Sequence, residues 1–218
     1  LYYDNMYAPG GSIIGTKLAY SDNNGNNWLS IVDANVGYDK NWIAADQTAG
    51  PYTNYVYGVM SGGTVVRSTN RGQSFQSVGF YTNTLPGMMV AVGPNGATQG
   101  GSVYVVASTG NSFAPQWTFY RSTDGGTTWE LRSTQFYGNA VGDAVNGRNS
   151  VQNMRTRPYP FIAADNSYGP NRGRLYLIYA SNFPQGAGNK PDIWCRWSDD
   201  GGSNWSAEVK INDDANSE

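Results

Sequence analysis

An eight-residue pattern occurs four times in the sequence, and it constrains the fold more than any other feature. Its copies are SDNNGNNW at 21–28, STNRGQSF at 68–75, STDGGTTW at 122–129 and SDDGGSNW at 198–205. Asp or Asn at the third position can accept hydrogen bonds from backbone N–H groups further along a turn. Gly at the fifth position accepts a positive φ at little cost. The pattern therefore predicts a repeated structural turn between two strands rather than four catalytic sites.

Each copy of the turn belongs to a larger repeat of four short apolar segments. The first segments are WIAAD at 42–46, MVAVG at 89–93 and FIAAD at 161–165, and their small residues suit a crowded central axis. A second segment follows in each repeat, a third leads into the turn, and a fourth leaves it. Four-stranded units at this spacing are typical of β-propeller blades.

The repeats predict an all-β fold, a β-propeller of four-stranded antiparallel blades. Leu1-Tyr2 matches Val56-Tyr57, so the first unit enters at its second strand. We therefore expect three complete blades and one partial blade. Their approximate bounds are 1–36, 37–82, 83–135 and 156–213, with a long loop insertion at 136–155. Because a closed ring needs more blades, we expect this single propeller segment to be part of a longer chain.

The composition excludes several classes of function. The 28 Gly and 16 Tyr, with only 14% charged residues, fit an all-β protein with many turns. Without His, the chain cannot form Ser-His-Asp or Cys-His catalytic sites or His-based zinc sites. A net charge of −2 without a basic run disfavours nucleic-acid binding, and no run reaches transmembrane length. The abundant Asn, Gly, Ser, Thr and Tyr indicate a secreted, extracellular or cell-surface bacterial protein.

The four turns resemble the Asp-box, or bacterial neuraminidase repeat, of sialidase-like propellers. Asp124 and Asp200 stand in the Asp position, and Asn23 and Asn70 replace it in the other two copies. The resemblance extends over the whole chain and implies the fold. It implies no single activity, since similar boxes occur in sortilin-like receptors and xyloglucan hydrolases. In sialidases these boxes lie at the periphery, away from the catalytic centre.

Blade topology predicts which face carries function. Strands alternate in direction, so the box turns share one face with the loops between first and second strands, whose length is constant here. The loops on the opposite face vary in length, and variable loops on a rigid scaffold are where binding usually occurs. Aromatic rings there could stack on sugars, while cationic side chains could bind hydroxyl groups or a carboxylate. The candidate ligand-binding residues are Tyr38, Lys40, Trp117, Arg148, Arg155, Arg157, Tyr159, Phe183 and Lys190.

The resemblance also allows a test of catalytic function. Sialidases carry an Arg triad for the sugar carboxylate, a Tyr nucleophile paired with Glu, and an Asp acid/base. The first Arg belongs to an Arg-x-Pro motif, and the nearest match is Arg157, which precedes Pro160 by three residues rather than two. In a strand, one residue of slip turns a side chain to the other face. We therefore assign no catalytic residue.

Acidic residues leave three functional interpretations open. Glu130 and Glu208 fall in outer strands, and Glu218 in the tail. A glycosidase with two carboxylates could draw on aspartates of the variable loops, namely Asp39, Asp143 and Asp192. The favoured function is a module that binds a glycan or a cell-surface protein. The alternatives are a glycoside hydrolase of exo-α-sialidase type and a structural component of a larger cell-surface complex.

Two aspartates raise the question of a metal. Asp46 and Asp165 end the first strands of their blades at equivalent positions. They could ligate Ca²⁺ together with loop carbonyls, but capping of the strand-end turn is the simpler interpretation. We expect no other cofactor.

Overall fold

The computed structural model describes residues 2–111, 116–137, 141–145, 148–152, 154–157, 159–182 and 191–213. Eighteen strands form five antiparallel sheets in these residues, and no helix occurs there. Three sheets have four strands in sequence order, and a fourth has three. The all-β prediction of three complete blades and one partial blade is confirmed.

The partial blade comes first along the chain, followed by the complete ones. Its strands are β1 (Tyr2–Tyr7), β2 (Ile13–Tyr20) and β3 (Leu29–Val36). The second blade has β4 (Asn41–Ala45), β5 (Val56–Met60), β6 (Thr64–Ser68) and β7 (Gln76–Phe80). The third has β8 (Met89–Asn95), β9 (Thr98–Ser108), β10 (Trp117–Ser122) and β11 (Glu130–Gln135). The last has β15 (Phe161–Ala164), β16 (Leu175–Ser181), β17 (Asp192–Ser198) and β18 (Val209–Lys210).

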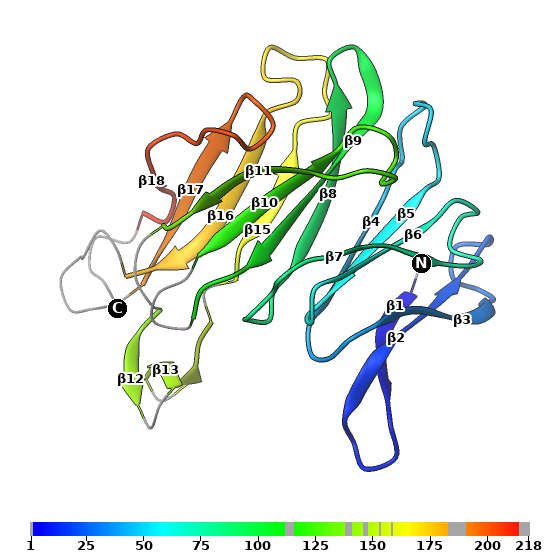
Figure 1. Cartoon of the computed structure of the whole chain (residues 1–218), viewed down its shortest axis with the longest axis horizontal. Coiled ribbons are helices and arrows are strands. Elements are labelled where there is room, and N and C mark those ends of the chain that lie inside the picture. Colours follow the sequence, from blue (N-terminus) through cyan, green and yellow to red (C-terminus); the bar gives the residue numbers. More distant parts are fainter. Residues whose placement is uncertain are drawn as a thin grey trace.

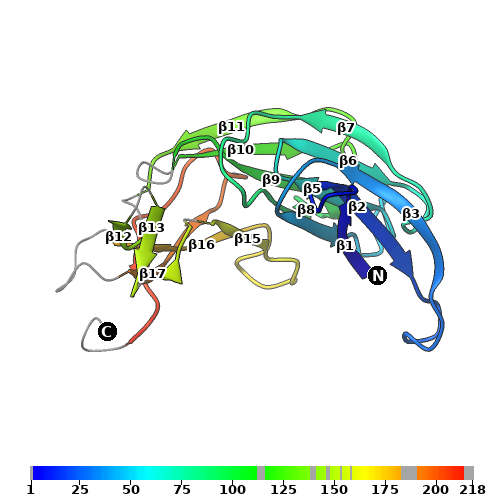
Figure 2. The ribbon, with the colours of Figure 1, turned by 90° about the horizontal axis from the view of Figure 1, so that it is seen from below.

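The sheets stand side by side in an open arc. Figure 2 shows the outer strands β7 and β11 on the convex side, with β1, β8 and β15 on the concave side. The first strands β4 and β15 both pack against β8. The concave side of the arc is therefore lined by the first strands of the three complete blades.

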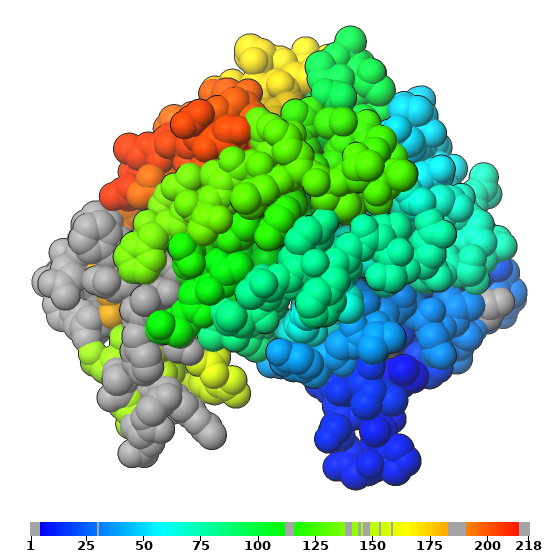
Figure 3. All heavy atoms as spheres, viewed as in Figure 1, coloured from blue at the N-terminus to red at the C-terminus, as the bar shows by residue number. Residues whose placement is uncertain are grey.

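The insertion at 136–155 is more ordered than the predicted loop. It contains β12 (Asp143–Val145), β13 (Arg148–Val151) and β14 (Met154–Arg155), which pair as a small antiparallel sheet. Figure 1 shows this sheet and the β1–β2 hairpin projecting on the same side of the arc. In the space-filling view the two projections flank a hollow (Figure 3).

The register is the same in the three complete blades. The equivalent pairs of the first and second strands are Ala45–Val56, Val92–Val103 and Ala164–Leu175. The same second-strand residues lie opposite the first Ser of each box.

In the partial blade the predicted alignment of Tyr2 with Tyr57 is shifted by one residue from the observed register. Tyr2 pairs with Ala19, two residues before the box Ser, whereas Tyr57 pairs with Arg67, one residue before it.

The core lies between neighbouring blades. One cluster joins the second and third blades around Tyr57, Val90 and Val105, and another joins the third and last blades around Trp117, Phe119 and Leu177. The third blade therefore buries both of its faces against its neighbours, as expected for a propeller blade.

Candidate functional site

The polar groups of the Asp-box at 122–129 are used inside the turn itself. Ser122 Oγ accepts the Gly126 N–H at 2.8 Å and donates to Asp124 Oδ1 at 2.8 Å. Asp124 Oδ1 also accepts the N–H groups of Thr127 and Thr128 at 3.0 and 2.9 Å. Partial burial would raise the pKa of Asp124, but these hydrogen bonds outweigh it and lower the pKa to about 2.

The box glycines adopt the conformation that the sequence predicts. The fifth-position glycines have φ between 83° and 89°, and the fourth-position residues Asn24, Arg71, Gly125 and Gly201 also have positive φ, between 57° and 69°. The sequence pattern does not reveal this second left-handed position, because Asn and Arg occupy it in two of the four copies.

Two boxes also join neighbouring blades. The Arg67 guanidinium of the second blade donates to Gly125 O at 2.8 Å and to Thr127 Oγ1 at 3.0 Å in the next box. Arg132 of the third blade donates to Asp200 O at 2.8 Å in the last box. The polar groups of the box face therefore form hydrogen bonds within the turns and between blades, which gives this face a structural role.

The strand-end aspartates cap turns. Asp46 Oδ1 accepts the Thr48 N–H at 2.8 Å and its hydroxyl at 2.7 Å, and Asp165 Oδ1 accepts the Ser167 N–H at 2.8 Å. Over the part of the chain that the structure describes, no group of three or more His, Cys, Asp or Glu residues could hold a metal ion. These contacts fit turn capping. A Ca²⁺ ion at these aspartates stays a prediction from the sequence.

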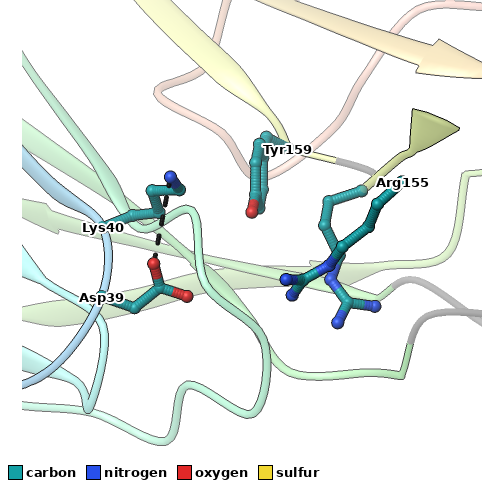
Figure 4. A pocket seen from close by; sticks show the side chains of 5 residues that line it. Asp39, Lys40, Arg155 and Tyr159 are labelled. Atoms are coloured by element: carbon teal, nitrogen blue, oxygen red, sulfur yellow. Dashed lines mark ion pairs between the residues drawn. The ribbon is translucent and has the colours of Figure 1, made fainter. Parts of the chain in front are cut away.

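A cavity of about 260 Å³ opens on the opposite face, slightly smaller than the sizes usual for small-ligand pockets. It lies between the link that precedes β4 and the link that precedes β15, two segments more than a hundred residues apart. Figure 4 shows the Tyr159 hydroxyl, the Asp39 carboxylate and the Arg155 guanidinium directed toward the same space. The lining residues are Asp39, Lys40, Arg155, Arg157 and Tyr159.

Ser61, fully buried in the β5–β6 turn, fixes the first of these links. Its N–H donates to Lys40 O at 2.8 Å, while its hydroxyl accepts the Lys40 N–H at 3.2 Å. Its carbonyl accepts the Tyr38 N–H at 3.1 Å. Asp39, between them, has φ of 73°, a left-handed conformation that Asp tolerates better than most residues. The link is thus held rigidly with the Asp39 and Lys40 side chains at the pocket.

The second link is fixed by the insertion and by a glycine. Thr156 donates its N–H to Asn149 O at 3.0 Å in β13, and Tyr159 donates its N–H to Arg157 O at 3.0 Å. The Tyr159 ring lies on Gly87, where an added Cβ would come within 2.4 Å of Tyr159 Cδ1. Because Gly87 also has φ of 106°, only glycine suits this contact. The Tyr159 ring is therefore positioned by the link between β7 and β8.

The electrostatics of the pocket favour an anion. Three cationic side chains face one carboxylate, and the Lys40–Asp39 pair is loose, with Nζ and Oδ1 3.9 Å apart. Burial and then the Asp39 charge raise the pKa of Tyr159, against the lowering effect of Arg157 and Arg155. The Tyr159 hydroxyl therefore stays protonated at neutral pH and can donate a hydrogen bond.

Comparisons with known proteins identify a related repeat and related folds. A family model described as BNR/Asp-box repeat matches residues 120–131. A GH93 α-L-arabinofuranosidase of Fusarium graminearum, solved with arabinobiose, superposes with a TM-score of 0.53 at 14% identity, over 82% of this chain and 49% of that one. A variant of an α-L-arabinofuranosidase from the same fungus, with an iminosugar inhibitor, gives 0.50 at 16% identity, over 100% of this chain and 50% of that one. The chain has a β-propeller fold with Asp-box repeats.

This Asp-box propeller spans about half the length of the arabinofuranosidases that it matches. The NanB sialidase of Streptococcus pneumoniae gives a TM-score of 0.48 at 14% identity, over 90% of this chain and 28% of that one. No curated protein sequence matches the chain. At these identities the structural comparisons establish the fold alone. Among the described residues, no helix is long and apolar enough to cross a membrane.

Of the nine candidate ligand-binding residues in the propeller, four meet at this pocket: Lys40, Arg155, Arg157 and Tyr159. Tyr38 lies beside them, 56% exposed, with its ring against Gly62. Phe183 and Lys190 lie outside the described residues, as does the side chain of Arg148 in β13.

Trp117 requires a correction. It is fully buried at the start of β10, where its ring packs 4.9 Å from Tyr179 and 5.8 Å from Tyr137, measured between ring centroids. The predicted binding role is wrong, because the side chain points into the core between the third and last blades. Its position next to a variable loop does not expose it.

Two larger surface hollows of the propeller are less suited to an anionic ligand. A hollow of about 470 Å³ lies by the first box, and another of about 430 Å³ separates the partial blade from the second. The first is lined by box and strand-end residues such as Ser21 and Asp46, which already bond their own turns. The second is lined largely by apolar side chains at a blade boundary, among them Met6 and Phe75. Neither gathers several cationic side chains.

Proposed function

We propose that this propeller is a secreted module that binds an acidic glycan through the pocket at Lys40, Arg155, Arg157 and Tyr159. The observation that carries the proposal is the convergence of three cationic side chains and a neutral hydroxyl donor from two separated links. Guanidinium groups match carboxylates in charge and geometry, and charge-assisted hydrogen bonds are the stronger kind. The target would be a carboxylate-bearing sugar on a cell surface or in an extracellular polymer.

The rigid mounting of the pocket supports binding. Buried Ser61 fixes the link that carries Lys40, and Gly87 fixes the Tyr159 ring. Little ordering is then left to occur when a ligand arrives, which lowers the entropic cost of association.

A glycan array tests the proposal. We expect the protein to retain uronic-acid or sialic-acid oligosaccharides and to ignore neutral ones. Arg157→Ala should weaken the affinity about tenfold to a hundredfold, the worth of a hydrogen bond to a charged group. Arg157→Lys should restore only part of it, since Lys keeps the charge and loses the planar fork.

Arg71→Ala is the matched control. Arg71 is an exposed arginine on the box face, so its loss changes the net charge equally without touching the pocket. Equal weakening by both variants, or preference for neutral glycans, would contradict the proposal.

A hydrolase of sialidase type is the second candidate, because Arg157, Tyr159 and Asp39 line one pocket. The described glutamates lie elsewhere: Glu130 pairs with Arg132 in β11, and Glu208 with Arg196 near β18. The pocket therefore offers no Tyr–Glu pair among its lining residues. Release of a fluorophore from an α-sialoside, abolished in Tyr159→Phe, would favour hydrolysis over binding.

A further inference from the structure

Two aromatic side chains on the concave side of the arc are exposed although they touch each other. Trp42 of β4 and Phe161 of β15 meet edge to face, with ring centroids 5.6 Å apart and planes at 84°. Trp42 is 40% exposed and Phe161 47%. Large aromatic side chains that are this exposed and yet ordered by mutual contact form a preformed apolar surface.

The register explains why these two rings meet. Trp42 pairs with Val59, Met89 with Val106, and Phe161 with Ile178. Each partner lies three residues after the second-strand residue that faces the box Ser of its blade, which is Val56, Val103 or Leu175. The three residues therefore occupy one equivalent position in successive blades. Met89, in the middle, is buried, and the flanking rings of Trp42 and Phe161 are in contact with each other.

This aromatic pair adjoins the cationic pocket. Trp42 follows the pocket residue Lys40 by two positions, and Phe161 follows Tyr159 by two. Two residues of chain span at most about 7 Å, so the backbone of each aromatic residue lies close to the backbone of a pocket residue, on the side of the first strands. In each of the two chain segments, a pocket residue is therefore followed by an exposed aromatic residue.

We propose that the pocket and the Trp42–Phe161 pair form one elongated site for an acidic oligosaccharide of at least two sugar units. The acidic unit is held by Arg155, Arg157 and Lys40, and the adjoining unit stacks its apolar ring face on the aromatic pair. This inference rests on the proposed function and adds that a single acidic sugar fills only part of the site.

Two pairs of probes test the inference by isothermal titration calorimetry. They are galacturonic acid against trigalacturonic acid, and N-acetylneuraminic acid against 3′-sialyllactose. For the pair that binds, we expect the oligosaccharide to bind about three- to tenfold more tightly than the single sugar, the worth of one aromatic contact. Phe161→Leu and Trp42→Leu should remove this advantage and leave the affinity for the single sugar unchanged.

The variants separate failure of this inference from failure of the proposed function. Leu keeps apolar bulk and removes the ring, and an unchanged melting temperature shows that the fold is intact; a variant that melts early is replaced by Trp42→Met or Phe161→Met. If single sugar and oligosaccharide bind equally, or if ring removal weakens both equally, the elongated site is overturned and the pocket stands. If neither pair binds, or Arg157→Ala changes nothing, both proposals are overturned.

Discussion

The two faces of the arc use polar residues in opposite ways. On the box face, both carboxylate oxygens of Asp124 accept hydrogen bonds from N–H and hydroxyl groups of its own turn. On the pocket face, Lys40 and Asp39 form a loose pair with Nζ and Oδ1 3.9 Å apart, and Arg155 is exposed beside them. The polar groups that recur in every box therefore stabilise the fold. The charged groups of the pocket, which do not recur, are weakly paired and can bind a ligand.

Trp117 gives the strongest challenge to this division, because it lies at the start of β10 beside a variable loop and yet belongs to the core. We expect Trp117→Ala to lower the free energy of unfolding by about 3–5 kcal/mol, the usual cost of emptying a buried aromatic site. Urea denaturation measures the change. Trp28→Ala is the control, since Trp28 is 51% exposed and should cost far less. Similar losses in the two variants would show that burial does not decide their roles.

Gly126→Ala tests the box face with a smaller effect. Gly126 has φ of 83°, and an added Cβ would lie 3.2 Å from Tyr57 Cε1. A left-handed non-glycine residue costs about 1–2 kcal/mol, and the contact with Tyr57 adds to it. Denaturant midpoints should therefore fall more for Gly126→Ala than for Gly10→Ala, whose site has φ of 98° and open space. Glycan affinity should stay unchanged, and a box variant that weakens binding while folded would break the comparison.

Asp124 supplies the smallest effect, a pH dependence. Its folded pKa of about 2 lies below the ordinary value of 3.8, so its contribution to stability is complete above pH 4 and is lost as pH falls toward 2. Melting temperatures of the parent should therefore fall more steeply between pH 4 and pH 2 than those of Asp124→Asn. Asn occupies the same position in the first two boxes, so the variant should keep the turn. Parallel curves for both proteins would contradict this assignment.

Much of the fold could be predicted because it repeats. The box pattern locates the turn between the third and fourth strands, and the constant spacing from the first strand to the second reflects a shared register. The insertion at 136–155 has no repeat to compare with, so the sequence predicts a loop where the structure has a small sheet. The partial blade was misaligned by one residue because two apolar letters are too few to fix a register.

The candidate site was predicted only in part. Topology places Lys40 and Tyr159 on one face, since each precedes a first strand, but it gives neither their distance nor their directions. The sequence gives no direction for the Trp117 side chain, because a variable loop next to a strand does not determine which way the first residue of the strand points. The contacts that position the pocket, from Ser61 and Gly87, leave no pattern in a single sequence, because they depend on close approach between separate blades.

The arginine contacts with the boxes also determine how the arc comes apart. Arg67 and Arg132 each hold the turn carbonyls of the following blade. A turn cannot open without releasing an arginine of its neighbour, so local melting in one sheet weakens the next. In repeat proteins such nearest-neighbour coupling makes unfolding spread along the array. The blades of this arc therefore lose structure cooperatively, as linked segments rather than as independent sheets.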